Sequence, residues 1–245
     1  GDRTANFSGR MEPAGSGRRH FFLATVIQTE ISRLLIEGAG ELGVFLTDEH
    51  ISAFERYIDE LKVWAEHMNL IRREDDREIV LKDFLDSLTV TRYLSESASV
   101  MDLGSGAGFP GIPAKIVRPD LKMVLLEARR KKVFFLKNLI RYLGLVRAEA
   151  HWYGESKEIE KNFRGAFDCV ISRAFGSLQE FSRKGVPFLR QGGILLAMKA
   201  KKGKAELEEN LPALEKMGLR LVFLNGLRLP FLGHERTLIG LRKEK

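Results

Sequence analysis

Cysteine is almost absent from this chain of 245 residues, which contains only Cys169. A single thiol can form neither an internal disulfide nor a cysteine-based zinc site or iron–sulfur cluster. Long apolar runs are absent too, because no stretch approaches the roughly 18 residues that a membrane-spanning helix needs. These absences favour a reducing compartment and give a membrane role no support, so we expect a cytoplasmic protein.

The sequence also lacks the residue patterns of hydrolytic and metal-dependent enzymes. It has no serine, histidine and aspartate signature, and its five histidines are scattered without the spacing of metal ligands. They stand at positions 20, 50, 67, 151 and 234. We therefore expect no metal site, and no histidine is a leading catalytic candidate.

The composition indicates a folded protein with a moderately basic charge. Hydrophobic residues make up 44% of the chain and charged residues 30%, which is enough apolar side chain for a core. The 40 Lys and Arg residues outnumber the 33 Asp and Glu residues, for a formal charge of +7. The length fits one large domain, or one domain with an added lobe.

Residues 1–19 are rich in Gly, Ser and Arg and poor in apolar side chains, so we expect a disordered tail. Arg18 and Arg19 precede an apolar stretch that resembles a twin-arginine export signal. This stretch is interrupted at Gln28 and no small-residue cleavage site follows it, so we expect no export.

The first third of the chain has helical periodicity and no strand pattern. A helix is expected over residues 21–37, closed by the glycine-rich stretch 38–43. A second helix is expected to begin at the N-cap Thr47, and a third pattern covers 79–88. These patterns predict an N-terminal helical lobe over residues 20–98.

From residue 99 onward, short apolar runs of strand length alternate with helical patterns. Because each crossover between parallel strands needs such a helix, the alternation predicts an α/β domain over residues 99–245, with a mostly parallel sheet. The last two runs have no helix between them and predict an antiparallel hairpin at the sheet edge. The strand runs are 100–103, 123–126, 148–152, 167–171, 193–198, 219–224 and 237–241, and the helical patterns are 112–117, 131–143, 177–189 and 205–217.

The run MDLGSGAGFPGIP, residues 101–113, follows the first of these strands and opens the next helix. Glycines at such a turn let backbone amides approach a nucleotide-like ligand. The spacing is G-x-G-x-G at Gly104, Gly106 and Gly108, and Phe109 stands where the dinucleotide fingerprint needs its third glycine. This spacing argues against NAD and FAD.

Two carboxylates flank this loop. Asp102 ends the first strand, where it can orient loop amides or attract a cationic ligand. Glu127 ends the second strand, at a position from which carboxylates accept hydrogen bonds from ribose hydroxyls; an exposed carboxylate at a helix N-terminus is the alternative. S-adenosylmethionine carries an ammonium and a sulfonium, so we expect it as the cofactor, with Asp102, Gly104, Gly106 and Glu127 among its contacts.

Several separated segments resemble one enzyme family. They are MNLIRR, VLKDFLDSL, DLGSGAGFPGIP, LLEARRKKVFFL, ISRAFGSL, AMKA and HERTLIG. From about residue 60 to the C-terminus, the sequence is similar to the bacterial small-subunit ribosomal RNA methyltransferase G family, also called the glucose-inhibited division protein B family. Membership implies a class I methyltransferase fold, S-adenosylmethionine as donor, and transfer to N7 of a guanine in the 530 loop of 16S rRNA.

The resemblance also implies site residues. Gly104 and Phe109 match cofactor contacts in the glycine loop, and Gly154 and Glu155 match the segment that holds the adenine. Arg173, in the SRAF stretch, matches a cofactor-site arginine.

Methylation of guanine N7 needs no general base, because N7 has an unshared pair and carries no proton. Most of the rate enhancement then comes from holding N7 in line with the methyl group. Arg173 is the best catalytic candidate, since it follows the fourth strand and can contact the cofactor or guanine O6; a structural ion pair is the alternative. Asp83 stands where the family usually has histidine, and the motif His234-Glu235-Arg236 has no assigned role.

Basic charge is concentrated in two segments that follow strand ends. Residues 127–141 hold six basic residues and one acid, and residues 199–204 hold four lysines. Both segments should flank the cofactor, where RNA phosphates would lie; a solvated face is the alternative. The candidate RNA-binding residues are Arg129, Arg130, Lys131, Lys132, Lys199, Lys201, Lys202 and Lys204.

The leading interpretation is an S-adenosylmethionine-dependent 16S rRNA (guanine-N7)-methyltransferase, a monomer that acts on 16S rRNA or on the small ribosomal subunit. Three other interpretations stay open. One is a methyltransferase of the same fold that acts on a small molecule or a protein, against which the basic segments argue. The others are a nicotinamide-dependent oxidoreductase, which Phe109 disfavours, and a non-catalytic RNA-binding or assembly factor that has kept the fold.

Overall fold

The structure is a computed structural model that describes residues 29–68, 70, 75–154 and 156–244. The tail expected over residues 1–19 lies outside the described residues, as does the first part of the helix expected over 21–37. Glu155, one of the residues expected to hold the adenine, also lies outside them.

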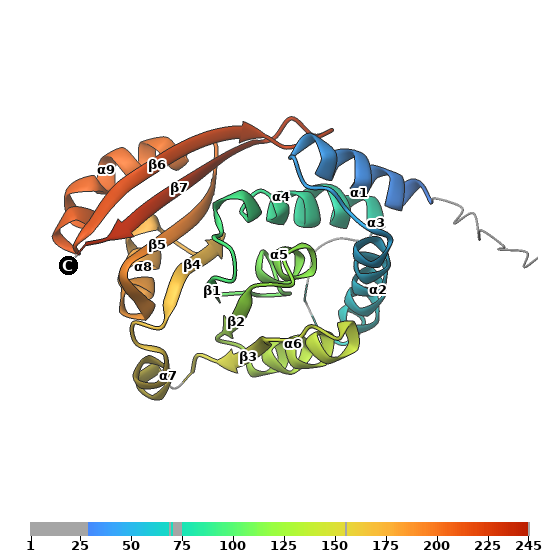
Figure 1. The fold of residues 1–245 in the computed structure, drawn as a ribbon, viewed down its shortest axis with the longest axis horizontal. Coiled ribbons are helices and arrows are strands. Elements are labelled where there is room, and N and C mark those ends of the chain that lie inside the picture. Colours follow the sequence, from blue (N-terminus) through green and yellow to red (C-terminus); the bar gives the residue numbers. More distant parts are fainter. Residues whose placement is uncertain (1–28, 69, 71–74, 155, 245) are drawn as a thin grey trace, which may run out of the picture.

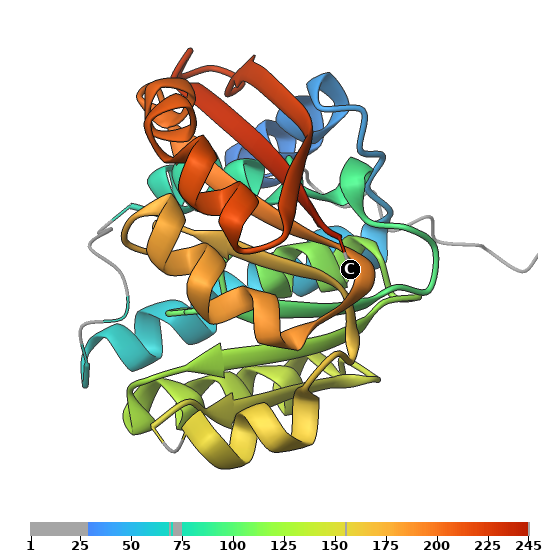
Figure 2. The ribbon, with the colours of Figure 1, turned by 90° about the vertical axis from the view of Figure 1, so that its left-hand side faces the viewer.

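The described part of the chain contains a seven-stranded sheet in the order β3-β2-β1-β4-β5-β7-β6. Strands β1 to β5 run parallel, and β7 is antiparallel to both β5 and β6, which confirms the predicted sheet and hairpin. Figure 2 shows β3 at one end of the sheet and the β6–β7 hairpin at the other. The strands are β1 (Ser99–Leu103), β2 (Lys122–Glu127), β3 (Ala148–Trp152), β4 (Phe167–Arg173), β5 (Leu189–Ala200), β6 (Leu219–Arg228) and β7 (Glu235–Lys243).

Helices cover both faces of the sheet (Figure 1). Side chains of β2 alternate between the faces, because Met123 and Leu125 belong to one core cluster and Val124 and Leu126 to the other. Helices α5 (Gly111–Val117) and α6 (Arg130–Leu143) pack on the first face. Helices α7 (Ser156–Phe163), α8 (Leu178–Gly185) and α9 (Gly203–Lys216) pack on the second.

Helix α7 is an element that the sequence pattern does not predict. Its segment SKEIEKNF contains only two apolar residues, Ile159 and Phe163, which is too few for a helical stripe. Both pack against the core cluster of α8 and α9. This helix therefore depends on tertiary packing more than on its own sequence pattern.

The expected helical lobe is present, and Thr47 is the N-cap of α2, as predicted. Its Oγ1 accepts a hydrogen bond from the His50 amide at 3.4 Å, while His50 Nδ1 accepts one from the Thr47 amide at 3.2 Å. The lobe consists of α1 (Glu30–Glu41), α2 (Asp48–Ala65), α3 (Asp76–Ile79), the π-helical turn η1 (Val80–Phe84), α4 (Leu85–Leu88) and the 3₁₀ turn η2 (Thr91–Tyr93).

Helix α1 continues beyond residue 37, where the glycine-rich stretch is expected to close it. A Cβ on Gly38 would overlap the side chain of Leu85, so this glycine lets α1 approach α4 closely and does not end the helix. The chain leaves the helix at Leu42 and Gly43, where Gly43 has a φ of +76°. The expected end was thus wrong by four residues.

The helical lobe shares its core with the sheet domain. The rings of Phe54 and Phe84 lie 4.8 Å apart within the lobe, and Tyr57 stacks on Phe109 of the glycine loop with 5.5 Å between ring centroids. One core cluster therefore continues from α2 through the loop to α5 and α6. The lobe therefore packs against one side of the glycine loop. The exact domain boundary at residue 99 stays a prediction.

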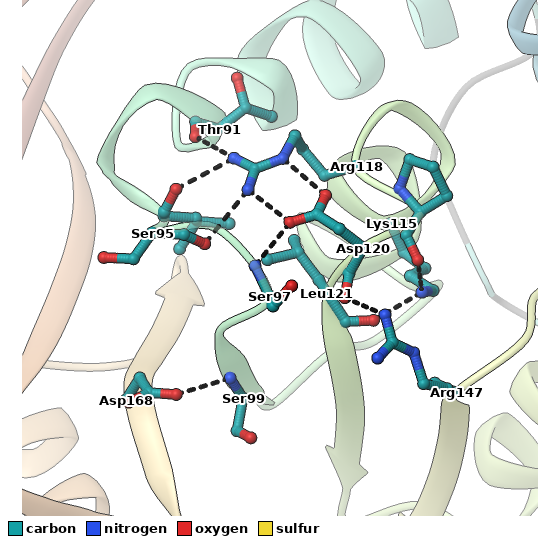
Figure 3. Close-up of polar contacts among 12 residues, drawn as sticks. Thr91, Ser95, Ser97, Ser99, Lys115, Arg118, Asp120, Leu121, Arg147 and Asp168 are labelled. Atoms are coloured by element: carbon teal, nitrogen blue, oxygen red, sulfur yellow. Dashed lines mark hydrogen bonds and ion pairs between the residues drawn. The ribbon is translucent and has the colours of Figure 1, made fainter.

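Arg118 joins the end of the lobe to the sheet edge at which β1 and β2 begin (Figure 3). Its guanidinium donates to both carboxylate oxygens of Asp120, at 2.8 and 2.7 Å, and to the carbonyls of Leu94 and Ser95, at 3.0 and 3.1 Å. Hydrogen bonding to Arg118 holds the pKa of Asp120 well below its usual range. In open parallel sheets ligands bind at the opposite edge, where the strands end.

No helix in the described ranges is both long and apolar enough to cross a membrane. The same residues contain no group of three or more His, Cys, Asp or Glu side chains placed to hold a metal ion.

Tyr57→Phe should lower the free energy of unfolding by about 1–3 kcal/mol, since the buried Ala107 carbonyl would lose its donor. Urea denaturation of the two proteins measures this difference. Tyr142→Phe, at a tyrosine that is 46% exposed, is the control and should change stability by less than about 0.5 kcal/mol. Equal effects of the two substitutions would show that the Tyr57 hydroxyl does not hold the loop.

Candidate functional site

The glycine loop, residues 104–110, connects the end of β1 to the start of α5. The Gly104 amide donates to the Leu126 carbonyl at 2.8 Å, which folds the loop over the end of β2. From the other side, Tyr57 Oη donates to the Ala107 carbonyl at 2.6 Å. The loop is therefore held by the sheet and by the helical lobe together.

Asp102 lies fully buried beneath the loop. Its Oδ2 accepts a hydrogen bond from the Gly111 amide at 2.9 Å, so this carboxylate orients a backbone amide at the start of α5. Burial raises the pKa of Asp102 to about 7. Its Oδ1 has no hydrogen-bond partner among the described residues.

Glu127 is bound to the same loop. It is 8% exposed, its Oε2 accepts a hydrogen bond from the Gly106 amide at 2.9 Å, and its Oε1 accepts one from the Arg129 amide at 2.8 Å. The alternative expected an exposed carboxylate, and that exposure is wrong, although Glu127 does bind the amide of Arg129 at the start of α6. A contact between Glu127 and a ribose hydroxyl stays a prediction.

A cavity of about 290 Å³ lies against the loop, and we call it the glycine-loop cavity. Phe109 is 4% exposed and forms part of its wall while it stacks on Tyr57. The cavity is lined by Leu70, Asp83, Gly104, Ser105, Gly106, Ala107, Phe109, Lys132, Arg173 and Ala174.

Arg173 ends β4 and reaches from the sheet to the helical lobe. Its guanidinium donates to Asp83 Oδ1 at 2.8 Å and to the Lys82 carbonyl at 3.1 Å, and Asp86 Oδ2 lies 3.6 Å away. The guanidinium also lies over the Phe109 ring, 4.8 Å from its centroid. With 20% of the side chain exposed, Arg173 takes part in a structural ion pair and still borders the cavity.

A second cavity of about 970 Å³, the larger cavity, shares Asp83, Arg173 and Ala174 with the first. Arg236 also lines it and donates from Nε to Asp86 Oδ1 at 2.9 Å, and Asp86 is 2% exposed. The two arginines and two aspartates thus form one partly buried network. The lining residues are Lys82, Asp83, Asp86, Arg173, Ala174, Gly176, Met198, Lys199, Ala200, Lys201, Lys202, Gly203, Glu206, His234 and Arg236.

The basic residues after β5 differ in their surroundings. Lys199 Nζ donates to the Gly176 carbonyl at 2.9 Å and pairs with Glu206 at 3.0 Å, so it holds the loop after β4 as well as lining the larger cavity. Lys201 and Lys202 are exposed on the same cavity. Lys204 lies farther along α9, 3.9 Å from Glu208, and does not line the cavity.

The basic residues after β2 also separate into two groups. Lys132 lines the glycine-loop cavity, and burial lowers its pKa. Arg129, Arg130 and Lys131 are exposed at the start of α6, where the Arg130 guanidinium lies 3.8 Å from the centroid of the Trp152 ring. Their binding to RNA stays a prediction.

Gly154 follows β3 and is exposed. It does not line the glycine-loop cavity or the larger cavity in the described structure. A role for Gly154 and Glu155 at the adenine therefore stays a prediction.

Sequence reasoning missed the lobe residues that complete the site. Tyr57 lies three positions after Phe54 on the apolar stripe of α2, and this spacing was the available signal. The only sequence signal at Asp83 was that the family usually has histidine at this position. The contact of the Lys82 carbonyl with Arg173 depends on the tertiary structure, and no sequence signal could have found it.

The residues around the glycine-loop cavity fit S-adenosylmethionine. Asp102 and Glu127 bind the loop amides and do not line the cavity in the described structure. The carboxylate on its wall is Asp83, which suits a ligand that carries an ammonium and a sulfonium. Gly104 and Gly106 line the cavity with φ values of +80° and +60°, so a ligand meets backbone there and not side chains. The volume lies near the lower end of the roughly 300–1,000 Å³ of small-molecule sites, and the cavity adjoins the larger one at Arg173.

Solved structures with a similar fold define the class. A SAM-dependent methyltransferase of Aquifex aeolicus aligns with a TM-score of 0.50 at 18% identity, over 76% of this chain and 97% of that one. TYW2 of M. jannaschii, solved in complex with AdoMet, aligns with a TM-score of 0.53 at 18% identity, over 66% and 76%. The fold is that of the Rossmann-like class I methyltransferases, as predicted.

Sequence comparison then gives the family. The model of rRNA small subunit methyltransferase G matches residues 50–237. A ribosomal RNA small subunit methyltransferase G of Geobacter sulfurreducens is 41% identical over 208 residues, which cover 84% of this chain and 95% of the relative. One of Acetivibrio thermocellus is 38% identical over 218 residues, 88% of this chain and 90% of the relative. The chain belongs to the rRNA small subunit methyltransferase G family, which confirms the resemblance predicted from its segments.

Gly106→Ala should raise the Kd for S-adenosylmethionine at least about tenfold, or about 1.4 kcal/mol. Gly106 has a φ of +60° and lines the cavity, so a side chain would strain the loop and occupy ligand space. Gly144→Ala is the matched control, with a φ of +67° and open space at the end of α6. Calorimetric titration should find normal affinity in the control, and an unchanged Kd for Gly106→Ala would contradict the assigned site.

The contribution of Asp102 to stability should fall as pH rises from about 4 to about 7, because the folded protein binds the Asp102 proton more tightly than the unfolded chain does. The favourable contribution is complete below the unfolded pKa of 3.8 and is lost as pH passes the folded value of about 7. Asp102→Asn stays neutral, so between pH 5 and pH 8 it should lose less stability than the parent, by on the order of 2 kcal/mol. Urea denaturation at the two pH values measures this, and the exposed Asp59→Asn should follow the parent; equal pH dependence in all three proteins would refute the buried titration.

Proposed function

We propose that this chain transfers a methyl group from S-adenosylmethionine to N7 of a guanine in the 530 loop of 16S rRNA. The observation that carries the proposal is the meeting of two cavities at Arg173, Asp83 and Ala174, in a chain that belongs to the methyltransferase G family. One cavity offers a glycine loop for the donor, and the other offers cationic side chains for an RNA acceptor. The shared wall would bring donor and acceptor together.

The cofactor would lie against the glycine loop, held by Asp102, Gly104, Gly106, Phe109 and Glu127. Gly154, Glu155 and Arg173 would complete the site. When bound, S-adenosylmethionine supplies a methyl group on a positively charged sulfur. Because the loop is already held in place, the cofactor-binding residues need little rearrangement to bind S-adenosylmethionine.

Guanine N7 carries no proton, so the chain needs no general base, and its contribution is orientation and exclusion of water. Arg173 is the catalytic residue of this proposal. Its guanidinium would donate to guanine O6 and so present N7 toward the donor. Asp83 and the Lys82 carbonyl, which bind the same guanidinium, fix its direction.

The acceptor would be 16S rRNA, either free or within the small ribosomal subunit. The exposed basic residues on both sides of the cavities support a polyanionic partner. We infer that the protein acts as a monomer in the cytoplasm, where this RNA is found.

The proposal is tested with small ribosomal subunits from cells that lack this methylation. Incubation with methyl-labelled S-adenosylmethionine should label 16S rRNA, and chemical cleavage at N7-methylguanine should place the label in the 530 loop. Label in a protein or a small molecule, or no label at all, would refute the proposal.

Arg173→Lys should lower kcat about 10- to 100-fold in this assay, since lysine keeps the charge but loses the planar set of donors. Lysine at this position also keeps a cationic partner for Asp83. Arg190→Lys, at an exposed arginine that pairs with Asp168, is the control and should keep normal kcat. A normal kcat for Arg173→Lys would limit Arg173 to a structural ion pair.

A further inference from the structure

A third cavity continues the path that begins at the glycine loop. This hairpin cavity has a volume of about 310 Å³ and lies between the ends of β5, β6 and β7. It shares Lys201 and Arg236 with the larger cavity, just as the larger cavity shares Arg173 with the glycine-loop cavity. The three cavities therefore lie next to one another in a row from the loop to the β6–β7 hairpin, and we call this row the groove.

The strand register places the hairpin beside the site. Ala200 at the end of β5 pairs with Arg236, and Arg228 at the end of β6 pairs with Glu235. The turn between β6 and β7, residues 229–234, thus projects from the sheet edge at which the parallel strands end. Figure 1 shows this end of the hairpin beside α1.

Carboxylates along the groove are matched by cations. Asp83 pairs with Arg173 and Asp86 with Arg236, at 2.8 and 2.9 Å. Farther along, Glu206 pairs with Lys199 at 3.0 Å and Glu235 lies 3.6 Å from Arg228.

The charge that remains is positive. Lys201 and Lys202 are exposed on the groove and form no ion pair with any described residue. Arg228 is 75% exposed, and its long ion pair with Glu235 is weak in water. The outer half of the groove therefore offers flexible cations to a polyanion.

The groove also has enough volume to hold nucleotides. The larger cavity, at about 970 Å³, is more than three times the volume of the glycine-loop cavity, at about 290 Å³. The exposed Ala174 and Ala200 give it apolar surface on which a base can rest, while Met198 beside them is buried. The exposed basic residues at the start of α6, in contrast, line none of the three cavities in the described structure.

We propose that a single-stranded RNA segment lies in this groove, with its target nucleotide in the larger cavity and the adjoining backbone over the β6–β7 hairpin at Lys201 and Arg228. This placement rests on the proposed function and adds the direction in which the strand leaves the site. Sequence-independent contacts at the hairpin hold the strand, while the larger cavity receives the base.

The test compares two double variants with equal loss of charge. Lys201→Gln with Arg228→Gln removes two cations that line the hairpin cavity. Arg220→Gln with Arg242→Gln removes two exposed cations at the far end of β6 and β7. Binding of 16S rRNA is measured over a range of salt concentrations, together with KM for methyl transfer and Kd for S-adenosylmethionine. All four side chains are at least partly exposed, and thermal unfolding confirms that both variants fold.

The hairpin variant should bind RNA at least about fivefold more weakly than the far-end variant and show the same rise in KM. Its salt slope should fall by about 1.4, or about 0.7 for each lost contact to a single strand. Affinity for S-adenosylmethionine should not change in either variant. A difference below fivefold between the two variants, or an equal salt slope, overturns the placement.

Failure of this inference is distinct from failure of the proposed function. If the parent protein methylates 16S rRNA and the two double variants behave alike, only the path of the strand is wrong. If the parent protein methylates no rRNA, the proposed function fails, and the comparison of RNA binding still decides the path.

Discussion

The hydrogen bond from Tyr57 to the Ala107 carbonyl joins the two halves of the molecule, and the site depends on it. Both partners are buried, and the Tyr57 ring stacks on Phe109 two residues farther along the loop. A glycine-rich turn has many accessible conformations, so it needs such contacts to hold one of them. The helical lobe is therefore part of the ligand site and not an appendage to the sheet.

Ion pairs hold together the wall between the two main cavities. Arg173 and Arg236 enter from strands, and Asp83 and Asp86 enter from the π-helical turn and the short helix after it. Buried charges are tolerated only when they are paired, so each element fixes the position of the others. A π-helical turn at this point agrees with the frequent occurrence of such turns at functional sites.

The amino ends of the parallel strands contribute to stability, and their carboxyl ends form the binding site. At the amino ends of the strands, Arg118 and Asp120 close the turns with short hydrogen bonds, and the buried Lys115 caps two further carbonyls at 2.8 and 2.6 Å (Figure 3). At the carboxyl ends, the loops line the cavities and carry exposed cations. This asymmetry is usual for open parallel sheets, whose ligands bind where the strands end.

The sequence by itself determined the fold class, the family, the glycine loop and the two carboxylates beside it, because these depend on local periodicity and on residues close together in the chain. It did not reveal helix α7 or the true end of α1, since packing against distant residues decides both. Only the tertiary structure brought Tyr57, Asp83, Arg173 and Arg236 to one site. These residues lie far apart in sequence, and their contacts exist only after the lobe has packed against the sheet and β7 has inserted between β5 and β6.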